Sequence, residues 1–176
     1  TGHVLDWTPT PDDAVSSFGA GGDTLLVGGA FHIVGGWRHR AGLAAIDLLT
    51  GRVKPWNPNP NGSVCTAITV GNGQVYVSGD FSVIGGDPQP RDCFAALDTL
   101  GGLVTTWDPG ANAPGTALLL SGDTLYVGGM FNQIGEQPRN GLAAVDAVTG
   151  MVLPWDPNAA SYFDGYSPVY AMAKRQ

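Results

Sequence analysis

Short apolar runs separated by glycine, aspartate and proline set the pattern of this chain. In its third unit an apolar run, TALLL, is followed by the turn letters SGD, and a second run, TLYVGGMF, begins at once. Runs of four to eight apolar and β-branched residues bounded by turn formers indicate β-strands. No segment keeps a helical period of 3.6 residues for three turns. The third unit therefore predicts four short strands, at 116–120, 124–131, 141–146 and 151–155.

The same pattern recurs with a period of about 50 residues, which is typical of four-stranded propeller blades. The segment LYVGGMF at 125–131 has near-copies in LLVGGAF at 25–31 and VYVSGDF at 75–81. We therefore predict an all-β fold, a partial β-propeller of about three four-stranded antiparallel blades. Three residue types recur with this period: Trp7, Trp56, Trp107 and Trp155; Asp47, Asp98 and Asp146; and Arg40, Arg91 and Arg139.

On this interpretation residues 1–176 form one repeat domain with orphan strands at both ends. The blade units are roughly 14–56, 64–107 and 115–155, flanked by a fourth strand at 4–7 and a first strand at 169–173. Free-standing propellers usually have four to eight blades, and unpaired strand edges are a liability in a soluble protein. We therefore expect the chain to be a section of a longer protein, or to be completed by a partner.

Each recurring residue has a structural interpretation. One tryptophan per blade, wedged between adjacent sheets, would bury a large apolar face in each junction. The aspartates begin turns such as D-x-x-T-G at 47–51 and 146–150, where a carboxylate accepts backbone N–H bonds. The arginines are expected to make the same structural contact in every blade, to a turn carbonyl or to the repeat aspartate. The alternative is that the arginines line a shared binding face.

These residues resemble bacterial delta-60 type propeller repeats, whose pattern reads Y-V-G-G-x-F-x-x-I-G-G, then R, then L-A-A-x-D-x-x-T-G and W-x-P. The resemblance covers nearly the whole chain three times and implies a propeller without a shared chemistry. The chain is also similar to kelch repeats, through the glycine pair, the downstream aromatic residue and the tryptophan. It is similar to the tryptophan-docking repeats of quinoproteins as well. Compared with the quinoprotein repeat, the segments AIDLLTGRVKPW at 45–56 and AVDAVTGMVLPW at 144–155 have one extra residue before the tryptophan.

Composition narrows the classes of partner and chemistry. A net charge of −7 leaves no basic stripe for nucleic acid or an anionic membrane surface, and no apolar run approaches the ~20 residues of a membrane span. His3, His32, His39 and the two cysteines show no metal-ligand spacing. We therefore predict no metal, no cofactor and no catalytic residue. Cys65 and Cys93 are expected to be unpaired thiols, because a strand should separate them.

We expect recognition to use loops on the rigid scaffold. The loop at 156–168 is longer than its counterparts and adds aromatic residues of the kind enriched in interfaces. The alternative is that these rings fold back over the open blade. A second cluster lies in the first unit's loop at 32–40, where the alternative is a variable, exposed loop. The candidate partner-binding residues are Tyr162, Phe163, Tyr166, Trp37 and His39.

The sequence favours a non-enzymatic structural or interaction module that docks on another protein or completes a larger propeller. Low lysine content, abundant glycine, asparagine and threonine, and the family resemblance indicate an extracellular or periplasmic location at the cell surface. Two alternatives stay open. One is a fragment of a propeller enzyme, quinoprotein-like or galactose-oxidase-like, and the other is a propeller that binds a glycan through its exposed aromatic residues.

Overall fold

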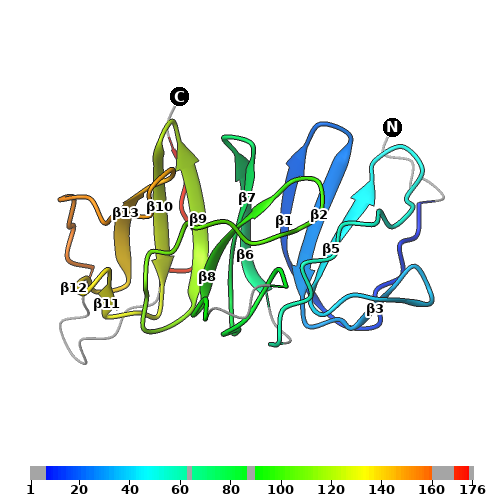
Figure 1. Ribbon diagram of the computed structural model, residues 1–176, viewed down its shortest axis with the longest axis horizontal. Helices are drawn as coiled ribbons and strands as arrows, with labels where there is room; N and C mark the ends of the chain where they lie inside the picture. The colour runs from blue at the N-terminus through cyan, green and yellow to red at the C-terminus, as the bar shows by residue number, and fades with distance from the viewer. Residues whose placement is uncertain (1–6, 63–64, 87–89, 160–168, 175–176) are drawn as a thin grey trace.

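The chain forms a row of small antiparallel sheets. The computed structural model describes residues 7–62, 65–86, 90–159 and 169–174, which contain three three-stranded sheets and two two-stranded hairpins. The three larger sheets stand side by side in chain order, from blue and cyan to yellow (Figure 1). Their strands are β1 (Val15–Gly21), β2 (Thr24–Gly29) and β5 (Leu43–Asp47); β6 (Cys65–Gly71), β7 (Gln74–Gly79) and β8 (Phe94–Asp98); and β9 (Gly115–Ser121), β10 (Thr124–Gly129) and β13 (Leu142–Asp146).

We call these sheets blades 1, 2 and 3. In each blade the second strand lies in the middle and pairs antiparallel with the strands before and after it. The register repeats as well, because the first residue of the middle strand pairs with the final aspartate of the third strand. These pairs are Thr24 with Asp47, Gln74 with Asp98, and Thr124 with Asp146. The prediction of an all-β, partial propeller is confirmed.

The fourth strand of each blade is shorter than the sequence predicts. It is reduced to one bridge to the third strand, at Val53 with Ile46, Val104 with Leu97, and Val152 with Val145. In blades 1 and 3 the second residue after the bridge is Pro55 or Pro154. Proline has no N–H, so it cannot extend the ladder of hydrogen bonds.

Two segments expected to be loops contain short hairpins. In blade 1, β3 (Ile33–Val34) pairs with β4 (Arg38–His39), and in blade 3, β11 (Gln133–Ile134) pairs with β12 (Gln137–Pro138). The orphan strands have different outcomes. Residues 4–6 lie outside the described residues, and the described residues 169–173 are not assigned to a strand.

The apolar core lies between the blades. One buried cluster joins Leu26 and Leu43 of blade 1 to Val75 and Leu97 of blade 2, with Trp56 among them. A second cluster joins blade 2 to blade 3 through a similar set of side chains around Trp107. Because each blade buries its faces against its neighbours, the outer faces of the end blades depend on whatever lies beyond them.

One tight turn carries a residue that is poorly suited to it. The turn before the third strand has a positive φ in every blade, at Gly42 (68°), Cys93 (66°) and Gly141 (67°). Glycine adopts this left-handed conformation freely, whereas a residue with a Cβ is disfavoured there by roughly 1–2 kcal/mol.

We predict that Cys93→Gly raises the free energy of unfolding by about 1 kcal/mol, because it removes this backbone cost. Urea unfolding followed by circular dichroism measures the change. The matched control is Gly42→Ala, which should lower the free energy of unfolding by a similar amount. A Cys93→Gly variant that is less stable than the parent would show that packing of the thiol outweighs the backbone conformation.

Candidate functional site

Each junction between blades is spanned by one tryptophan that reaches forward to the next blade. Its indole N–H donates to the carbonyl of the aspartate that ends the next blade's third strand. The pairs are Trp7 with Asp47 at 3.3 Å, Trp56 with Asp98 at 2.9 Å, and Trp107 with Asp146 at 3.0 Å. The acceptor is the repeat aspartate's backbone carbonyl each time, so this bond fixes the position of the tryptophan along the strands of the next blade.

Trp155 is the next tryptophan in this series and lies on the outer face of blade 3. It is 44% exposed, whereas Trp56 and Trp107 are 3% and 2% exposed. Its ring meets the Tyr126 ring edge-on at 5.2 Å, as the Trp107 ring meets the Tyr76 ring at 5.4 Å. Trp155 therefore already has the arrangement of a junction tryptophan on its own blade. Among the described residues it has no next blade to cover it.

A second repeated contact joins the first strands of adjacent blades. The hydroxyl of the second residue of each blade's first strand donates to the carbonyl of the residue that begins the next blade's first strand. The pairs are Ser16 with Cys65 at 2.7 Å, Thr66 with Gly115 at 2.5 Å, and Thr116 with Val169 at 2.5 Å. Val169 thus occupies the place where the first strand of a fourth blade would begin. A Cβ added to Gly128 would lie 2.8 Å from a Val169 methyl group, so glycine is needed for this close approach.

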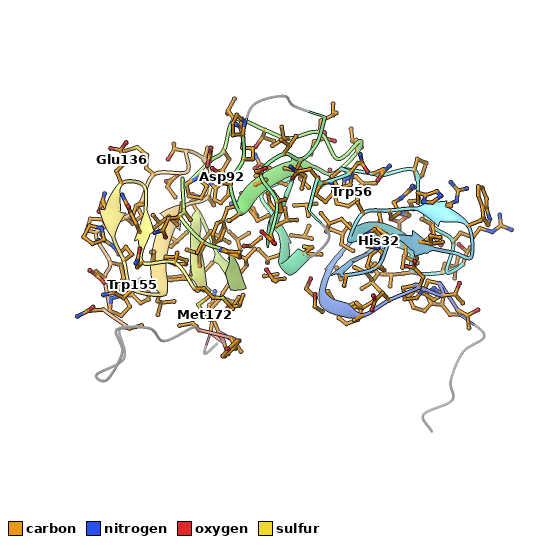
Figure 2. The ribbon with its side chains drawn as sticks, turned by 90° about the horizontal axis from the view of Figure 1, so that it is seen from below. His32, Trp56, Asp92, Glu136, Trp155 and Met172 are labelled. Atoms are coloured by element: carbon orange, nitrogen blue, oxygen red, sulfur yellow. The ribbon has the colours of Figure 1, made fainter. Side chains whose placement is uncertain are left out.

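The outer face of blade 3 is hollowed between its sheet and this last segment. A cavity of about 420 Å³ is lined by Leu119, Tyr126, Trp155 and Met172, among others. Figure 2 shows Trp155 and Met172 at the end of the molecule formed by blade 3, while Trp56 lies between blades 1 and 2. We call the surface formed by Leu119, Tyr126, Leu142 and Trp155 the blade 3 flank.

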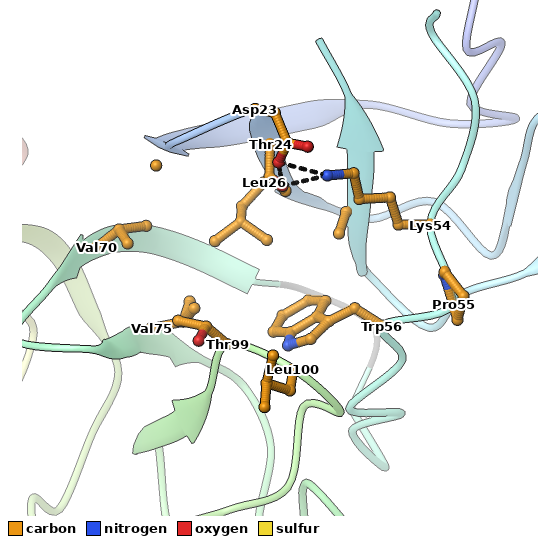
Figure 3. A pocket seen from close by; sticks show the side chains of 12 residues that line it. Asp23, Thr24, Leu26, Lys54, Pro55, Trp56, Val70, Val75, Thr99 and Leu100 are labelled. Atoms are coloured by element: carbon orange, nitrogen blue, oxygen red, sulfur yellow. Dashed lines mark hydrogen bonds and ion pairs between the residues drawn. The ribbon is translucent and has the colours of Figure 1, made fainter.

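A different cavity, of about 320 Å³, lies inside the junction between blades 1 and 2. Figure 3 shows Leu26, Val70, Val75 and Trp56 around it, with Lys54 at its rim. The Lys54 ammonium donates to the Asp23 carboxylate at 2.6 Å and to the Thr24 hydroxyl at 2.7 Å. The cavity is therefore apolar inside and charged at its edge.

The repeat arginines contact the same part of each blade. Each guanidinium donates to a fourth-strand carbonyl: Arg40 to Lys54 at 2.9 Å, Arg91 to Thr105 at 3.4 Å, and Arg139 to Leu153 at 3.3 Å. Arg40 and Arg139 are buried. The arginines therefore bond to the carbonyls of fourth-strand residues whose own N–H groups donate to the third strand, at Ala45, Ala96 and Ala144.

The repeat aspartates close the hairpins after the third strands. The Asp47 carboxylate accepts from the backbone N–H and the hydroxyl of Thr50 at 2.8 and 2.7 Å, and Asp146 accepts from both groups of Thr149. In blade 2, where Gly101 stands in the place of this threonine, Asp98 accepts from the Gly101 backbone N–H at 2.6 Å. These bonds hold the pKa of each aspartate below its ordinary value.

The candidate partner-binding residues fall in two places. Trp37 and His39 are both exposed, Trp37 at 71%, and the Arg38 guanidinium stacks 4.6 Å from the Trp37 ring centre. They belong to the β3–β4 hairpin of blade 1 and are not part of the blade 3 flank. Tyr162, Phe163 and Tyr166 lie outside the described residues.

The two cysteines are free thiols. Burial raises the pKa of Cys65 to about 12 and that of Cys93 to about 11, so both are thiols and not thiolates at neutral pH. Within the described ranges, no group of three histidine, cysteine, aspartate or glutamate residues is placed to hold a metal ion. Those ranges also contain no helix long and apolar enough to cross a membrane.

Sequence reasoning missed two residues of the junction. The sequence pattern places Tyr76 and Tyr126 in strands, and the structure shows that both rings lie beside a junction tryptophan. The hydroxyl series was also missed, yet Ser16, Thr66 and Thr116 are spaced at the period of the repeat. A search for every position that recurs with this period would have found the hydroxyls.

Comparison with solved structures supports the fold. No protein-family model matches the chain, and no curated protein sequence matches it. The chain is similar to the computationally designed Ika4 protein, at 17% identity and a TM-score of 0.64, over 100% of this chain and 89% of that one. It is similar to the designed Ika8 protein at 17% identity and a TM-score of 0.60, over 93% of this chain and 41% of Ika8.

A third solved structure is BamB from Moraxella catarrhalis, at 21% identity and a TM-score of 0.44, over 82% of this chain and 38% of BamB. At 17% identity, the likeness to the two designed proteins shows a shared fold and no more. The specific assignment to delta-60 type repeats stays a prediction.

We predict that the two equivalent tryptophans differ sharply in their contribution to stability. Trp107→Ala should lower the free energy of unfolding by about 3–5 kcal/mol, because it empties a filled junction. Trp155→Ala should lower it by less than about 1 kcal/mol, because nearly half of that ring is exposed. Urea unfolding of the parent and both variants measures the difference, and equal losses would contradict the assignment of Trp155 to an open flank.

Proposed function

We propose that this chain is a non-enzymatic interaction module, a propeller section whose blade 3 flank receives a further blade. The observation that carries the proposal is the exposure of Trp155, at 44%, in a position where the preceding two tryptophans are buried at 3% and 2%. The further blade comes from the remainder of a larger propeller or from a protein partner. An extracellular or periplasmic setting remains the expectation for such an assembly.

The filled junction between blades 2 and 3 shows which groups the occupant must provide. Trp107 and Tyr76 both use backbone carbonyls of blade 3, at Asp146 for the indole N–H and at Ala147 for the phenol hydroxyl at 2.8 Å. Trp155 and Tyr126 present the same two donors at the blade 3 flank. The occupant should therefore be a β-sheet whose third strand ends in two such carbonyls. It also needs an apolar face to cover the tryptophan ring.

The last described residues support this position for the occupant. Val169 accepts the Thr116 hydroxyl bond that Cys65 and Gly115 accept at the two earlier junctions. Val169 therefore lies where the first strand of a further blade would begin.

The test is an extended chain in which residues 1–168 are followed by a second copy of residues 115–155. This joint keeps the register, because Val169 occupies the position of Gly115. We predict that Trp155→Ala costs about 3–5 kcal/mol in the extended chain, as for a filled junction. In the parent chain the same change should cost less than about 1 kcal/mol.

The control is Trp37→Ala, which removes an exposed ring that is not part of the flank and should have the same small effect in both chains. Urea unfolding monitored by circular dichroism gives all four differences. If Trp155→Ala costs the same in the parent and in the extended chain, the flank does not accept a blade and the proposal fails.

A further inference from the structure

The two internal junctions differ at several side chains, including Leu26 against Tyr76, Val70 against Leu120 and Val75 against Leu125, and the first junction contains a cavity. Leu26 of blade 1 and Tyr76 of blade 2 occupy the same place in the middle strand, since Leu26 pairs with Ala45 and Tyr76 pairs with Ala96. Both side chains are buried and face the next blade. The cavity of about 320 Å³ beside Leu26 lies in the junction that lacks the tyrosine.

Tyr76 shows how a phenol ring sits in such a junction. The ring is 1% exposed and meets the Trp107 ring edge-on, with centres 5.4 Å apart and planes at 74°. Its hydroxyl donates to the Ala147 carbonyl at 2.8 Å. The ring, the edge-on aromatic contact and the buried hydrogen bond together satisfy both the apolar and the polar groups of that junction.

The groups that hold the Tyr76 ring have counterparts around the cavity. Trp56 stands in the place of Trp107, and Thr99 follows Asp98 as Ala147 follows Asp146. Trp56 and Thr99 both line the cavity, together with Val70 and Val75 of blade 2. Leu26 supplies neither a ring nor a hydroxyl. The counterparts of the groups that contact the Tyr76 phenol are therefore present around the cavity, but no side chain fills the place of the phenol.

We propose that this cavity binds a small phenol, with its ring edge-on to Trp56 and its hydroxyl on the Thr99 carbonyl. The volume lies at the lower end of the range for small-molecule sites, about 300–1,000 Å³. It suits one substituted ring and not a larger ligand. Apolar walls with a carbonyl at Thr99, in the place that the Ala147 carbonyl has for Tyr76, favour a phenol over a hydrocarbon, because only the phenol has a hydroxyl to donate.

The rim adds a second reason for this class of ligand. Lys54 lines the cavity and is held by Asp23 at 2.6 Å and Thr24 at 2.7 Å, as Figure 3 shows. An ammonium group beside the mouth is a hydrogen-bond donor for a phenol oxygen, whereas an unsubstituted aromatic hydrocarbon has no acceptor for it and can gain only the attraction of a cation to a ring face. This site is separate from the blade 3 flank and does not depend on the function proposed for it.

The test is titration of the full chain with p-cresol by isothermal calorimetry, with toluene as the probe that lacks a hydroxyl. We expect one saturable p-cresol site per chain and at least tenfold weaker binding of toluene. N-acetyltyrosinamide provides a third arm. Tighter binding of that compound than of p-cresol would support the phenol class and assign the source to a tyrosine of a peptide.

Two variants fill the cavity from paired positions on adjacent strands of blade 1, and a third variant makes a copy of the cavity in the second junction. Leu26→Tyr supplies the missing ring and Ala45→Leu enlarges another buried wall residue. Each should weaken p-cresol binding at least tenfold while circular dichroism shows a folded chain. The triple change Tyr76→Leu, Leu120→Val and Leu125→Val gives the second junction the side chains found at these positions in the first. It should open the equivalent space and raise the stoichiometry from one to two.

Three results would overturn the proposal. The first is no saturable heat of p-cresol binding up to millimolar concentration. The second is unchanged affinity in folded Leu26→Tyr and Ala45→Leu chains, which would place the bound phenol elsewhere. The third is equal affinity for toluene and p-cresol, which would rule out the hydroxyl contact and with it the phenol class.

Discussion

The packing of one tryptophan per blade against the next blade is the interaction on which the rest of this structure depends. A three-stranded sheet of five- to seven-residue strands cannot bury both of its faces alone. The tryptophan supplies a large apolar surface between sheets, and its indole N–H ties that surface to a backbone carbonyl at a fixed height. Stability in such an array is passed from neighbour to neighbour, so an end blade lacks half of its support.

The same position of the middle strand has a different environment in each of the three blades. Tyr76 is buried in a filled junction between two blades, whereas Leu26 is buried beside a cavity in the other junction. Tyr126 lies on a face of blade 3 that no described blade covers. Smaller side chains distinguish the hollow junction from the filled one: Leu26 stands in the place of Tyr76, and Val70 and Val75 in the places of Leu120 and Leu125. The environment of Tyr126 depends on whether a neighbouring blade is present. The repeat therefore fixes the architecture, and departures from the repeat locate the places where something else can bind.

Much of the fold could be predicted from the sequence, because strand runs and turn residues act locally. The recurring aspartates, for example, accept turn N–H groups within five residues of themselves. The length of the fourth strand could not be predicted in the same way. It depends on where a proline ends the ladder, at Pro55 or Pro154, beside the fourth-strand carbonyls to which the repeat arginines donate. The direction in which each tryptophan reaches was also hidden, because its carbonyl partner lies about 40 residues ahead in the chain.

The most direct measurement of the central claim is amide hydrogen exchange at equivalent residues of β7 and β10. Tyr76 and Tyr126 occupy the same register in their sheets, so their intrinsic chemistry and hydrogen bonding are matched. If each blade is stabilised by the next, the Tyr76 amide should exchange at least ten times more slowly than the Tyr126 amide, because only blade 2 is covered on both sides. Equal protection of the two amides would show that blade 3 is stable without a neighbour, and would contradict the account.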